Sequence, residues 1–238
     1  MSPTSPASSP PDVCVIVPAA GRGARAGKGA IKQFRTIAGV PMLARAIRPF
    51  AQQPRVLEIV VALPPEFVEH PPPWLSEVAG HLLRLVPGGL TRADSVLAGL
   101  GALSPAVGVV LIHDAARPFV ASETVSEVIR RASAGVGAIA AIPLVDTLKR
   151  AEPRGQRVFE TVPRPGLWRA QTPQGFPRAA LEEAYRSWQA NGSGADATDD
   201  AALVEASGFP VELVPDRTTN LKITTPEDFR LAEALAVS

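Results

Sequence analysis

Apolar residues in this 238-residue chain gather in short continuous runs rather than alternating strictly with polar residues. Such runs are typical of strands buried on both faces, as in a parallel sheet that helices cover on both sides. The pattern predicts strands at residues 13–17, 57–63, 82–86, 107–112 and 136–142.

Between these runs, apolar positions recur at the spacing of amphipathic helices. Helices are expected at residues 42–52, 92–103, 123–134, 178–189, 199–206 and 226–236. The alternation of strands and helices predicts an α/β fold, a three-layer, doubly wound sandwich around a mostly parallel sheet. We expect residues 12–238 to form one domain, preceded by a disordered Ser- and Pro-rich tail at 1–11 that lacks the features of a secretory signal.

The stretch from residue 145 to about 175 breaks this rhythm, because it shows no helical period. Two short extended pieces, at 146–151 and 157–162, flank a charged loop and predict a β-hairpin. Its many charged residues argue against a core position, so it is expected to project as an arm. The arm either pairs with a partner subunit or is a solvated flap.

A glycine-rich, basic loop directly follows the first predicted strand. Its glycines are Gly21, Gly23, Gly27 and Gly29, and its basic residues are Arg22, Arg25, Lys28 and Lys32. Glycines let backbone N–H groups approach phosphate oxygens closely, and the cations neutralise phosphate charge. The loop therefore predicts nucleotide binding, with a basic surface loop as the alternative.

Two well-known phosphate-binding loops fit this segment only in part. Ala26 stands in the place of the third glycine of the dinucleotide fingerprint, which tolerates Ala, but residues 35–48 contain no acidic ribose-binding residue. The P-loop requires Ser or Thr after Gly-Lys, and this chain has Gly29 there. A dinucleotide-binding fold stays open, and a P-loop is excluded.

Residues that follow the other strands are further candidates, because ligands of doubly wound sheets bind beyond the carboxyl ends of the strands. Gly88 and Gly89 form a second glycine turn, where Thr91 or Asp94 is expected to cap the next helix. Asp114 follows the fourth strand and suits a hydrated Mg²⁺, or else it pairs with Arg117. The preceding His113 is interpreted as structural, and Thr225 with Asp228 as a helix start.

Overall composition excludes some classes of protein. The net charge of +1 argues against general nucleic-acid binding, and no apolar run is long enough to span a membrane. The single cysteine, Cys14, lies in the first strand and is expected to fill the core, which fits a reducing cytoplasm.

Beyond these patterns, the chain resembles a known family over nearly its whole folded length. The succession PAAGRGARAGKGAIKQ, GGLTRADSV, HDAARPF, VDTLKR, TVPRPGLWRAQTPQ, ATDDAALVE and TNLKITTPED is similar to the 2-C-methyl-D-erythritol 4-phosphate cytidylyltransferases. The resemblance implies a Rossmann-like nucleotidyltransferase fold and a CTP-dependent step of the non-mevalonate isoprenoid pathway. A related ribitol-5-phosphate cytidylyltransferase shares many of these motifs, so another polyol phosphate is the nearest alternative. A dinucleotide-dependent reductase and a non-enzymatic nucleotide sensor are the others.

The resemblance also implies roles for individual residues. It implies Arg25 and Lys32 as transition-state stabilisers and Asp114 as the Mg²⁺ ligand. Contacts to CTP are implied for Pro18, Ala19, Ala20, Gly21, Gly23, Gly89 and Ser95. Contacts to the polyol phosphate are implied for Arg117, Thr147, Arg164, Thr172 and Lys222, with Arg164 reaching from a neighbouring subunit's arm in a homodimer.

Two positions depart from the family's pattern. Ile31 replaces the proline that usually precedes the catalytic lysine, and Leu90 replaces an acidic residue of the second glycine turn. Neither change removes a charge-stabilising group.

Overall fold

The central sheet is built from continuous apolar strands, as the sequence pattern predicts. The computed structural model describes residues 12–21, 31–153, 155–191 and 199–237. Seven strands follow the order β11-β7-β10-β6-β1-β4-β5. Every pairing is parallel except those of β10, which runs antiparallel to β6 and β7. The strands are β1 (Asp12–Pro18), β4 (Val56–Leu63), β5 (Leu83–Pro87), β6 (Val107–Ile112), β7 (Gly137–Pro143), β10 (Trp168–Pro177) and β11 (Val211–Pro215).

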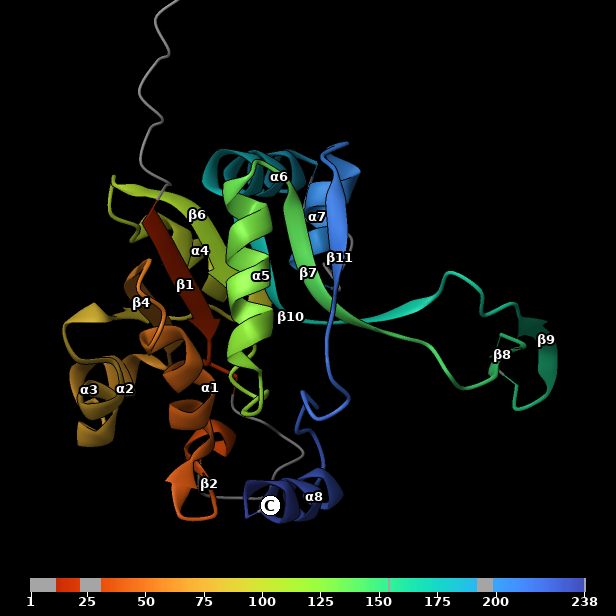
Figure 1. Cartoon of the computed structure of the whole chain (residues 1–238), viewed down its shortest axis with the longest axis horizontal. Helices are drawn as coiled ribbons and strands as arrows, with labels where there is room; N and C mark the ends of the chain where they lie inside the picture. The colour runs from red at the N-terminus through yellow and green to blue at the C-terminus, as the bar shows by residue number, and fades with distance from the viewer. Residues whose placement is uncertain (1–11, 22–30, 154, 192–198, 238) are drawn as a thin grey trace, which may run out of the picture.

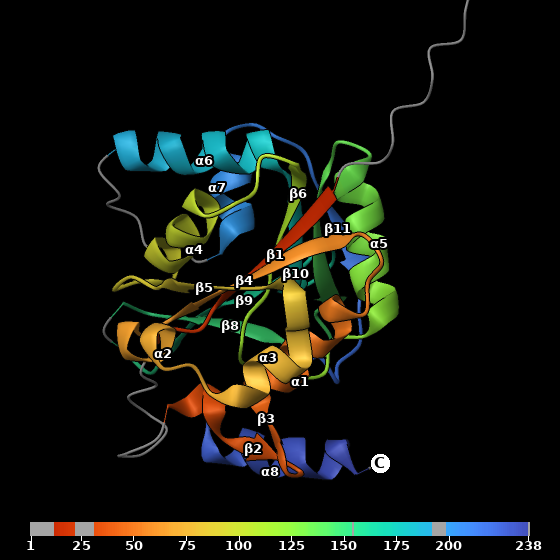
Figure 2. The same ribbon diagram turned by 90° about the vertical axis from the view of Figure 1, so that its left-hand side faces the viewer.

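Helices cover both faces of this sheet (Figures 1 and 2). Side chains of β1 alternate between the two faces, with Val13, Val15 and Val17 in one core cluster and Cys14 and Ile16 in the other. The first cluster includes residues of α1 (Met42–Ala51), α3 (Pro73–Ala79) and α5 (Ser122–Ser133), and the second includes residues of α4 (Arg92–Gly101), α6 (Arg178–Ala190) and α7 (Asp200–Ala206). The mostly parallel α/β fold with flanking helices is confirmed.

The C-terminal helix α8 (Pro226–Ala236) packs away from the sheet, against the small β2 (Thr36–Ile37) and β3 (Val40–Pro41) pair (Figure 2). A separate apolar cluster joins them: Ile37, Met42, Ile223, Phe229 and Ala232. Arg35 lies 3.8 Å from the centroid of the Phe229 ring, at cation–π distance. This packing holds the segment before α8, which contains Lys222, close to Lys32.

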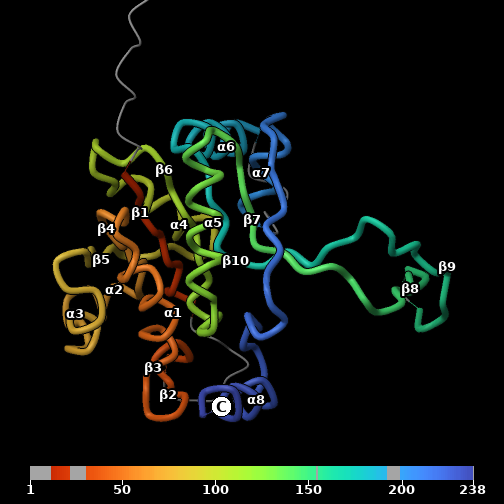
Figure 3. Tube along the Cα trace, viewed as in Figure 1, coloured from red at the N-terminus to blue at the C-terminus, as the bar shows by residue number. Residues whose placement is uncertain are grey.

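The strands β8 (Leu148–Ala151) and β9 (Val158–Val162) form a separate two-stranded antiparallel sheet. Figures 1 and 3 show this pair extending away from the main sheet, joined to it through β7 and β10. The expected arm boundary near residue 175 is wrong, because residues 168–177 form β10 inside the main sheet. The sequence pattern failed there because β10 contains Gln171, Thr172 and Gln174, whose burial depends on hydrogen bonds and not on apolar character.

Other differences from the sequence pattern are small. The expected strands and helices match within two residues at each end, and Thr91–Asp94 and Thr225–Asp228 both form capping boxes. The pattern missed β11 and the short helices α2 (Pro65–Glu69), α3, η1 (Lys32–Phe34) and η2 (Gly80–Leu82). In the part of the chain that the structure describes, no helix combines the length and apolar character needed to cross a membrane.

Candidate functional site

The site lies where the strand order reverses, between the carboxyl ends of β1 and β6. From β1 the chain moves outward to β4 and β5, then returns to the other side of β1 at β6. Loops diverge at such a switch point and leave a crevice above the sheet. Pro18 ends β1, and His113 and Asp114 follow β6, so the predicted loop and the predicted carboxylate meet at this crevice.

The start of the glycine-rich loop is held by Gln33 of η1. Its side-chain amide donates to the backbone carbonyls of Ala19 (2.9 Å) and Gly21 (2.7 Å). Lys32, the neighbouring residue, donates from Nζ to the carbonyl of Ile223. Two of the predicted site residues, Gly23 and Arg25, lie outside the described residues.

The second glycine turn packs tightly against the first loop. A Cβ atom on Gly88 would lie 2.3 Å from Cβ of Ala20, and one on Gly89 would lie 2.2 Å from Cβ of Asp94. Only glycine fits at such separations. The Ser95 hydroxyl accepts from Gly89 N (3.2 Å) and donates to the carbonyl of Thr91 (3.1 Å), which fixes the turn at the start of α4.

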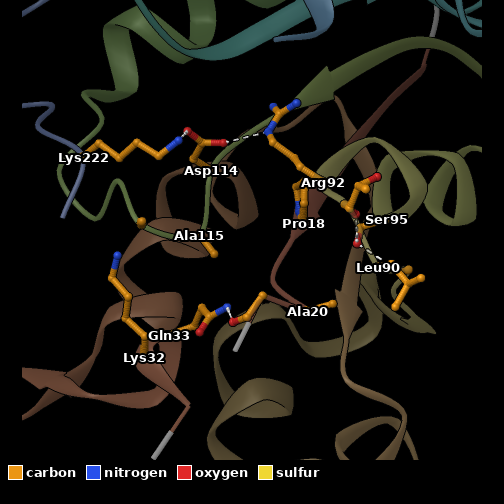
Figure 4. A pocket seen from close by; sticks show the side chains of 14 residues that line it. Pro18, Ala20, Lys32, Gln33, Leu90, Arg92, Ser95, Asp114, Ala115 and Lys222 are labelled. Atoms are coloured by element: carbon orange, nitrogen blue, oxygen red, sulfur yellow. Dashed lines mark hydrogen bonds and ion pairs between the residues drawn. The ribbon is translucent and has the colours of Figure 1, made fainter. Parts of the chain in front are cut away.

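A cavity of about 260 Å³, called here the first cavity, opens between these loops. Figure 4 shows its side chains, which converge from β1, η1, α4 and the loop after β6. Leu90 is fully exposed there. The lining residues are Pro18, Ala20, Gly21, Lys32, Gln33, Gly89, Leu90, Thr91, Arg92, Ser95, Asp114, Ala115, Ala116 and Lys222.

Asp114 is surrounded by cations. Its carboxylate lies 3.1 Å from Arg92 Nε, 2.9 Å from Lys222 Nζ and 3.6 Å from Arg117 Nε. Figure 4 shows Arg92 and Lys222 approaching it from opposite sides. Burial alone would raise the pKa of Asp114, but Arg92, Lys222 and Arg117 hold that pKa below its usual range. The carboxylate is therefore ionised at neutral pH. The ion pair of Asp114 with Arg117, expected as an alternative to metal binding, is present as one of these three contacts.

A second cavity, of about 310 Å³, adjoins the first and shares Arg92, Asp114 and Lys222 with it. Its other lining residues are Arg117, Ala170, Gln171, Thr172, Gln174 and Asp199. Buried hydrogen bonds shape its wall: Asn220 Nδ2 donates to the carbonyl of Thr172 (2.8 Å), and Arg117 Nη1 donates to the carbonyl of Asn220 (2.7 Å).

His113 supports this wall and lines neither cavity. It is fully buried, with Nδ1 3.0 Å from the Thr172 hydroxyl and Nε2 3.0 Å from the carbonyl of Arg117. Burial lowers the pKa of His113 to about 4, so the ring is neutral near pH 7. These contacts agree with its interpretation as a structural residue.

The predicted polyol-phosphate contacts divide into two groups. Arg117, Thr172 and Lys222 line the second cavity. Thr147 and Arg164 are exposed on the connections of the β8–β9 pair and line neither cavity of their own chain, and Arg164 Nη1 bonds the carbonyl of Val145.

Sequence reasoning missed Arg92 and Gln33. Arg92 is the first residue of α4, where the helix dipole disfavours a cation. A basic residue at this unfavourable position is the sequence signal that could have indicated a functional role. The contacts of Gln33 leave no such signal, because they depend on how η1 packs under the loop.

The carboxylate of Asp114 could serve as the single protein ligand of a hard cation such as Mg²⁺. Mg²⁺ commonly takes one or two protein carboxylates together with substrate phosphates, and Asp114 is a single ionised carboxylate between two cavities. Among the described residues, no group of three or more His, Cys, Asp or Glu side chains forms a ready metal cage. The donor set therefore fits a cation shared with phosphates.

Comparison with known proteins identifies the family. The family model described as "IspD: 2-C-methyl-D-erythritol 4-phosphate cytidylyltransferase" matches residues 13–237. The chain belongs to this family. The description of this family names a cytidylyltransferase, which does not favour the reductase or sensor alternatives.

Individual relatives agree with the family match. The chain is 43% identical over 226 residues to the 2-C-methyl-D-erythritol 4-phosphate cytidylyltransferase of Frankia casuarinae, covering 94% of this chain and 81% of that protein. It is 46% identical over 222 residues to a bifunctional IspD/IspF enzyme of Anaeromyxobacter dehalogenans, covering 92% of this chain but only 56% of that protein. The chain therefore spans just over half the length of this bifunctional relative.

A solved structure supports the fold in the same way. The crystal structure of 2-C-methyl-D-erythritol 4-phosphate cytidylyltransferase from Thermus thermophilus superposes with a TM-score of 0.77 at 38% identity. The match covers 95% of this chain and 100% of that one.

Proposed function

We propose that this chain transfers a cytidylyl group from CTP to 2-C-methyl-D-erythritol 4-phosphate, releasing pyrophosphate and 4-diphosphocytidyl-2-C-methyl-D-erythritol. The observation that carries the proposal is the pair of adjoining cavities that share Arg92, Asp114 and Lys222. A transfer between two phosphates requires two neighbouring anion sites with cations at their junction, and this geometry provides both.

The first cavity is proposed to bind CTP. Its walls combine glycine backbone at Gly21 and Gly89 with small side chains, so the base meets mainly backbone groups. CTP contacts are proposed for Pro18, Ala19, Ala20, Gly21, Gly23, Gly89 and Ser95. The second cavity is proposed to bind the polyol phosphate through Arg117, Thr172 and Lys222.

The chemistry needs no general base. A phosphomonoester has a second pKa of about 6, so the attacking oxygen is largely deprotonated near neutral pH. The difficulty is to bring two anions together and to stabilise charge that grows at the α-phosphate. Arg25 and Lys32 are proposed to stabilise that charge, because preorganised cations act most strongly in the transition state.

Asp114 is proposed to hold Mg²⁺ together with the triphosphate. When bound, the ion would neutralise part of the triphosphate charge. The carboxylate would exchange some of its present contact with Lys222 for the ion, which leaves Lys222 available to the acceptor phosphate.

A homodimer through the β8–β9 arm is also proposed. Within the described residues, the arm and its connections expose large apolar side chains that a lone subunit leaves in water: Val145, Leu148, Val158, Phe159, Leu167 and Trp168. Exposed apolar surface of this kind marks interaction sites. In such a dimer, Thr147 and Arg164 of the partner subunit would complete the second cavity.

The enzyme is proposed to act in the cytoplasm. The chain has one cysteine, Cys14, which is fully buried in β1 and serves as core filling. A sequence whose single cysteine cannot form an intrachain disulfide is consistent with a reducing compartment.

The proposed reaction is tested by pyrophosphate release from purified protein with each nucleotide and acceptor in turn. Release is expected with CTP and 2-C-methyl-D-erythritol 4-phosphate, in a magnesium-dependent manner. It is not expected with ATP or GTP, nor without an acceptor. Ribitol 5-phosphate is the matched acceptor control, and faster release with it would replace the proposed acceptor while preserving cytidylyl transfer.

A further inference from the structure

The guanidinium of Arg92 is held by two carboxylates from different parts of the fold. Its Nε lies 3.1 Å from Asp114 Oδ1, and its Nη2 lies 2.6 Å from Asp200 Oδ2. Burial alone would lower the pKa of Arg92, but the carboxylates of Asp200 and Asp114 raise it above its usual value. Since Arg92 lines both cavities, its charge is directed at their junction.

Asp200 lies behind Arg92 and lines neither cavity. It is fully buried at the first position of α7, and its second oxygen accepts the Tyr185 hydroxyl of α6 at 2.6 Å. Tyr185 is itself buried and is the chain's only tyrosine. The two oxygens of Asp200 thus have different donors, the tyrosine on one side and Arg92 on the other.

The start of α7 is itself fixed to the sheet. Gln174 of β10 donates to the Asp199 carboxylate at 2.9 Å and accepts from Ala201 N at 3.0 Å. Asp199 also caps the helix by accepting from Ala202 N. Asp200 therefore sits in a rigid frame, and a buried carboxylate in such a frame holds a long side chain in one orientation.

An arginine in this place needs such support. It stands at the first residue of α4, where the positive end of the helix dipole opposes it. Asp114 alone would be a shared partner, because Lys222 and Arg117 also approach it. With Asp200 present, Arg92 keeps a carboxylate of its own, and its bonds to the two carboxylates leave Nη1 for another acceptor.

We propose that Asp200 and Tyr185 are positioning residues for cytidylyl transfer: they act through Arg92 and hold its guanidinium where the phosphates of the two substrates meet. This inference rests on the proposed function. It assigns no substrate contact to Asp200 or Tyr185, and it makes Arg92 the group through which their loss is felt.

Two substitutions probe the arrangement. Asp200→Asn keeps the size of the side chain and removes its charge, and kcat is expected to fall about 10- to 100-fold, as for loss of a charged hydrogen bond. Tyr185→Phe removes one hydroxyl, and a fall of about 2- to 10-fold is expected. Glu205→Gln on α7 and Glu182→Gln on α6 are the matched controls, and both should keep wild-type rates.

The decisive measurement repeats both substitutions in an Arg92→Gln background. If Asp200 and Tyr185 act through Arg92, each double variant loses no more than about twofold beyond Arg92→Gln alone. Losses that multiply would overturn the inference, because they would show an effect independent of Arg92. Should Asp200→Asn fail to fold, judged by circular dichroism, the Tyr185→Phe cycle alone decides.

The wild-type reaction is measured beside the variants to separate two failures. Absence of pyrophosphate release by wild type would overturn the proposed reaction, and the same cycles would then be followed by CTP affinity in calorimetry. If the wild type turns over and the rate losses multiply in the double variants, only the positioning role is overturned. Coupled losses in either measurement support it.

Discussion

The carboxyl edge of the sheet and the β8–β9 arm both contain basic residues expected to bind phosphate, yet they are built differently. At the sheet edge, Arg117 is 9% exposed, and both it and Arg92 contact Asp114. On the arm, Arg164 is exposed, and within the described residues its side chain bonds only the backbone carbonyl of Val145. Phe159, an apolar residue of β9 on the same arm, is 66% exposed. The difference indicates that the site at the sheet edge is organised within one chain, and it is the reason why a partner subunit is proposed for the arm.

The largest effect is expected from Asp114→Asn. The change leaves Arg92, Lys222 and Arg117 clustered without their shared charge, and breaking a buried pair costs about 3–5 kcal/mol of unfolding free energy. Turnover should also disappear, because the proposed ion site is lost. Urea unfolding and pyrophosphate release measure the two effects. Asp12→Asn, exposed at the opposite end of β1, is the control, and equal behaviour of both variants would refute the central role of Asp114.

Lys32→Ala is expected to reduce kcat about 10²- to 10³-fold, or roughly 2.7–4 kcal/mol, with a smaller change in KM. The charge matters most where negative charge accumulates in the transition state. Arg25→Ala should behave in the same way. Steady-state kinetics measure the effect, with Arg48→Ala on the exposed face of α1 as control. Near-normal turnover would remove the residue concerned from the mechanism.

His113 should make the folded state of the main domain less stable in acid. Its pKa is about 4 in the folded chain against about 6.5 when unfolded, so the unfolded state binds the proton first as pH falls. The contribution of His113 to the free energy of unfolding is therefore fully present above pH 6.5, and it declines by about 3 kcal/mol between pH 6.5 and 4. Urea unfolding at several pH values measures this slope. It should vanish in His113→Gln and persist in His81→Gln, an exposed histidine; an unchanged slope in His113→Gln contradicts the assignment.

Arg164→Ala tests whether the arm acts on its partner. The KM for the polyol phosphate should rise about 10- to 100-fold, the equivalent of a lost charged hydrogen bond of about 1.5–3 kcal/mol. Arg150→Ala, which breaks only the arm's own pair with Glu160, should leave KM unchanged.

Mixed dimers then locate the action of Arg164. One chain carries Arg164→Ala and the other Lys32→Ala, and activity is measured after mixing at subsaturating acceptor. If Arg164 acts on the partner, one site keeps both residues and recovers activity. Demonstrably mixed dimers without recovery would show that the residue serves its own chain.

The smallest effect is expected from Phe159→Ser. The ring is exposed on the arm, so monomer stability should be unchanged, while association should weaken by about 1–2 kcal/mol per side chain if the ring is buried between subunits. Light scattering over a concentration series measures the dissociation. Leu231→Ser, exposed on α8, is the control, and an unaltered dimer in Phe159→Ser would exclude the ring from the interface.

Much of the architecture could be predicted because its information is local. Continuous apolar runs marked β1, β4 and β6, since strands buried on both faces need apolar side chains at every position. Thr91 with Asp94 and Thr225 with Asp228 marked helix starts, since the cap bonds lie within four residues.

The order of the motifs likewise indicated the family. Glycine turns and the residues that follow strands can be located in the sequence, because they directly follow the apolar runs.

The tertiary structure alone decided how the polar interior is arranged. Strand β10 resembles no buried strand in sequence, because the polar side chains of Gln171 and Gln174 bond to groups far along the chain, such as Asn220 and Ala201. The pairing of Arg92 with Asp200 joins residues 108 positions apart. Hydrogen bonds and ion pairs of this kind depend on which groups folding brings within about 3 Å, and no local pattern records that separation.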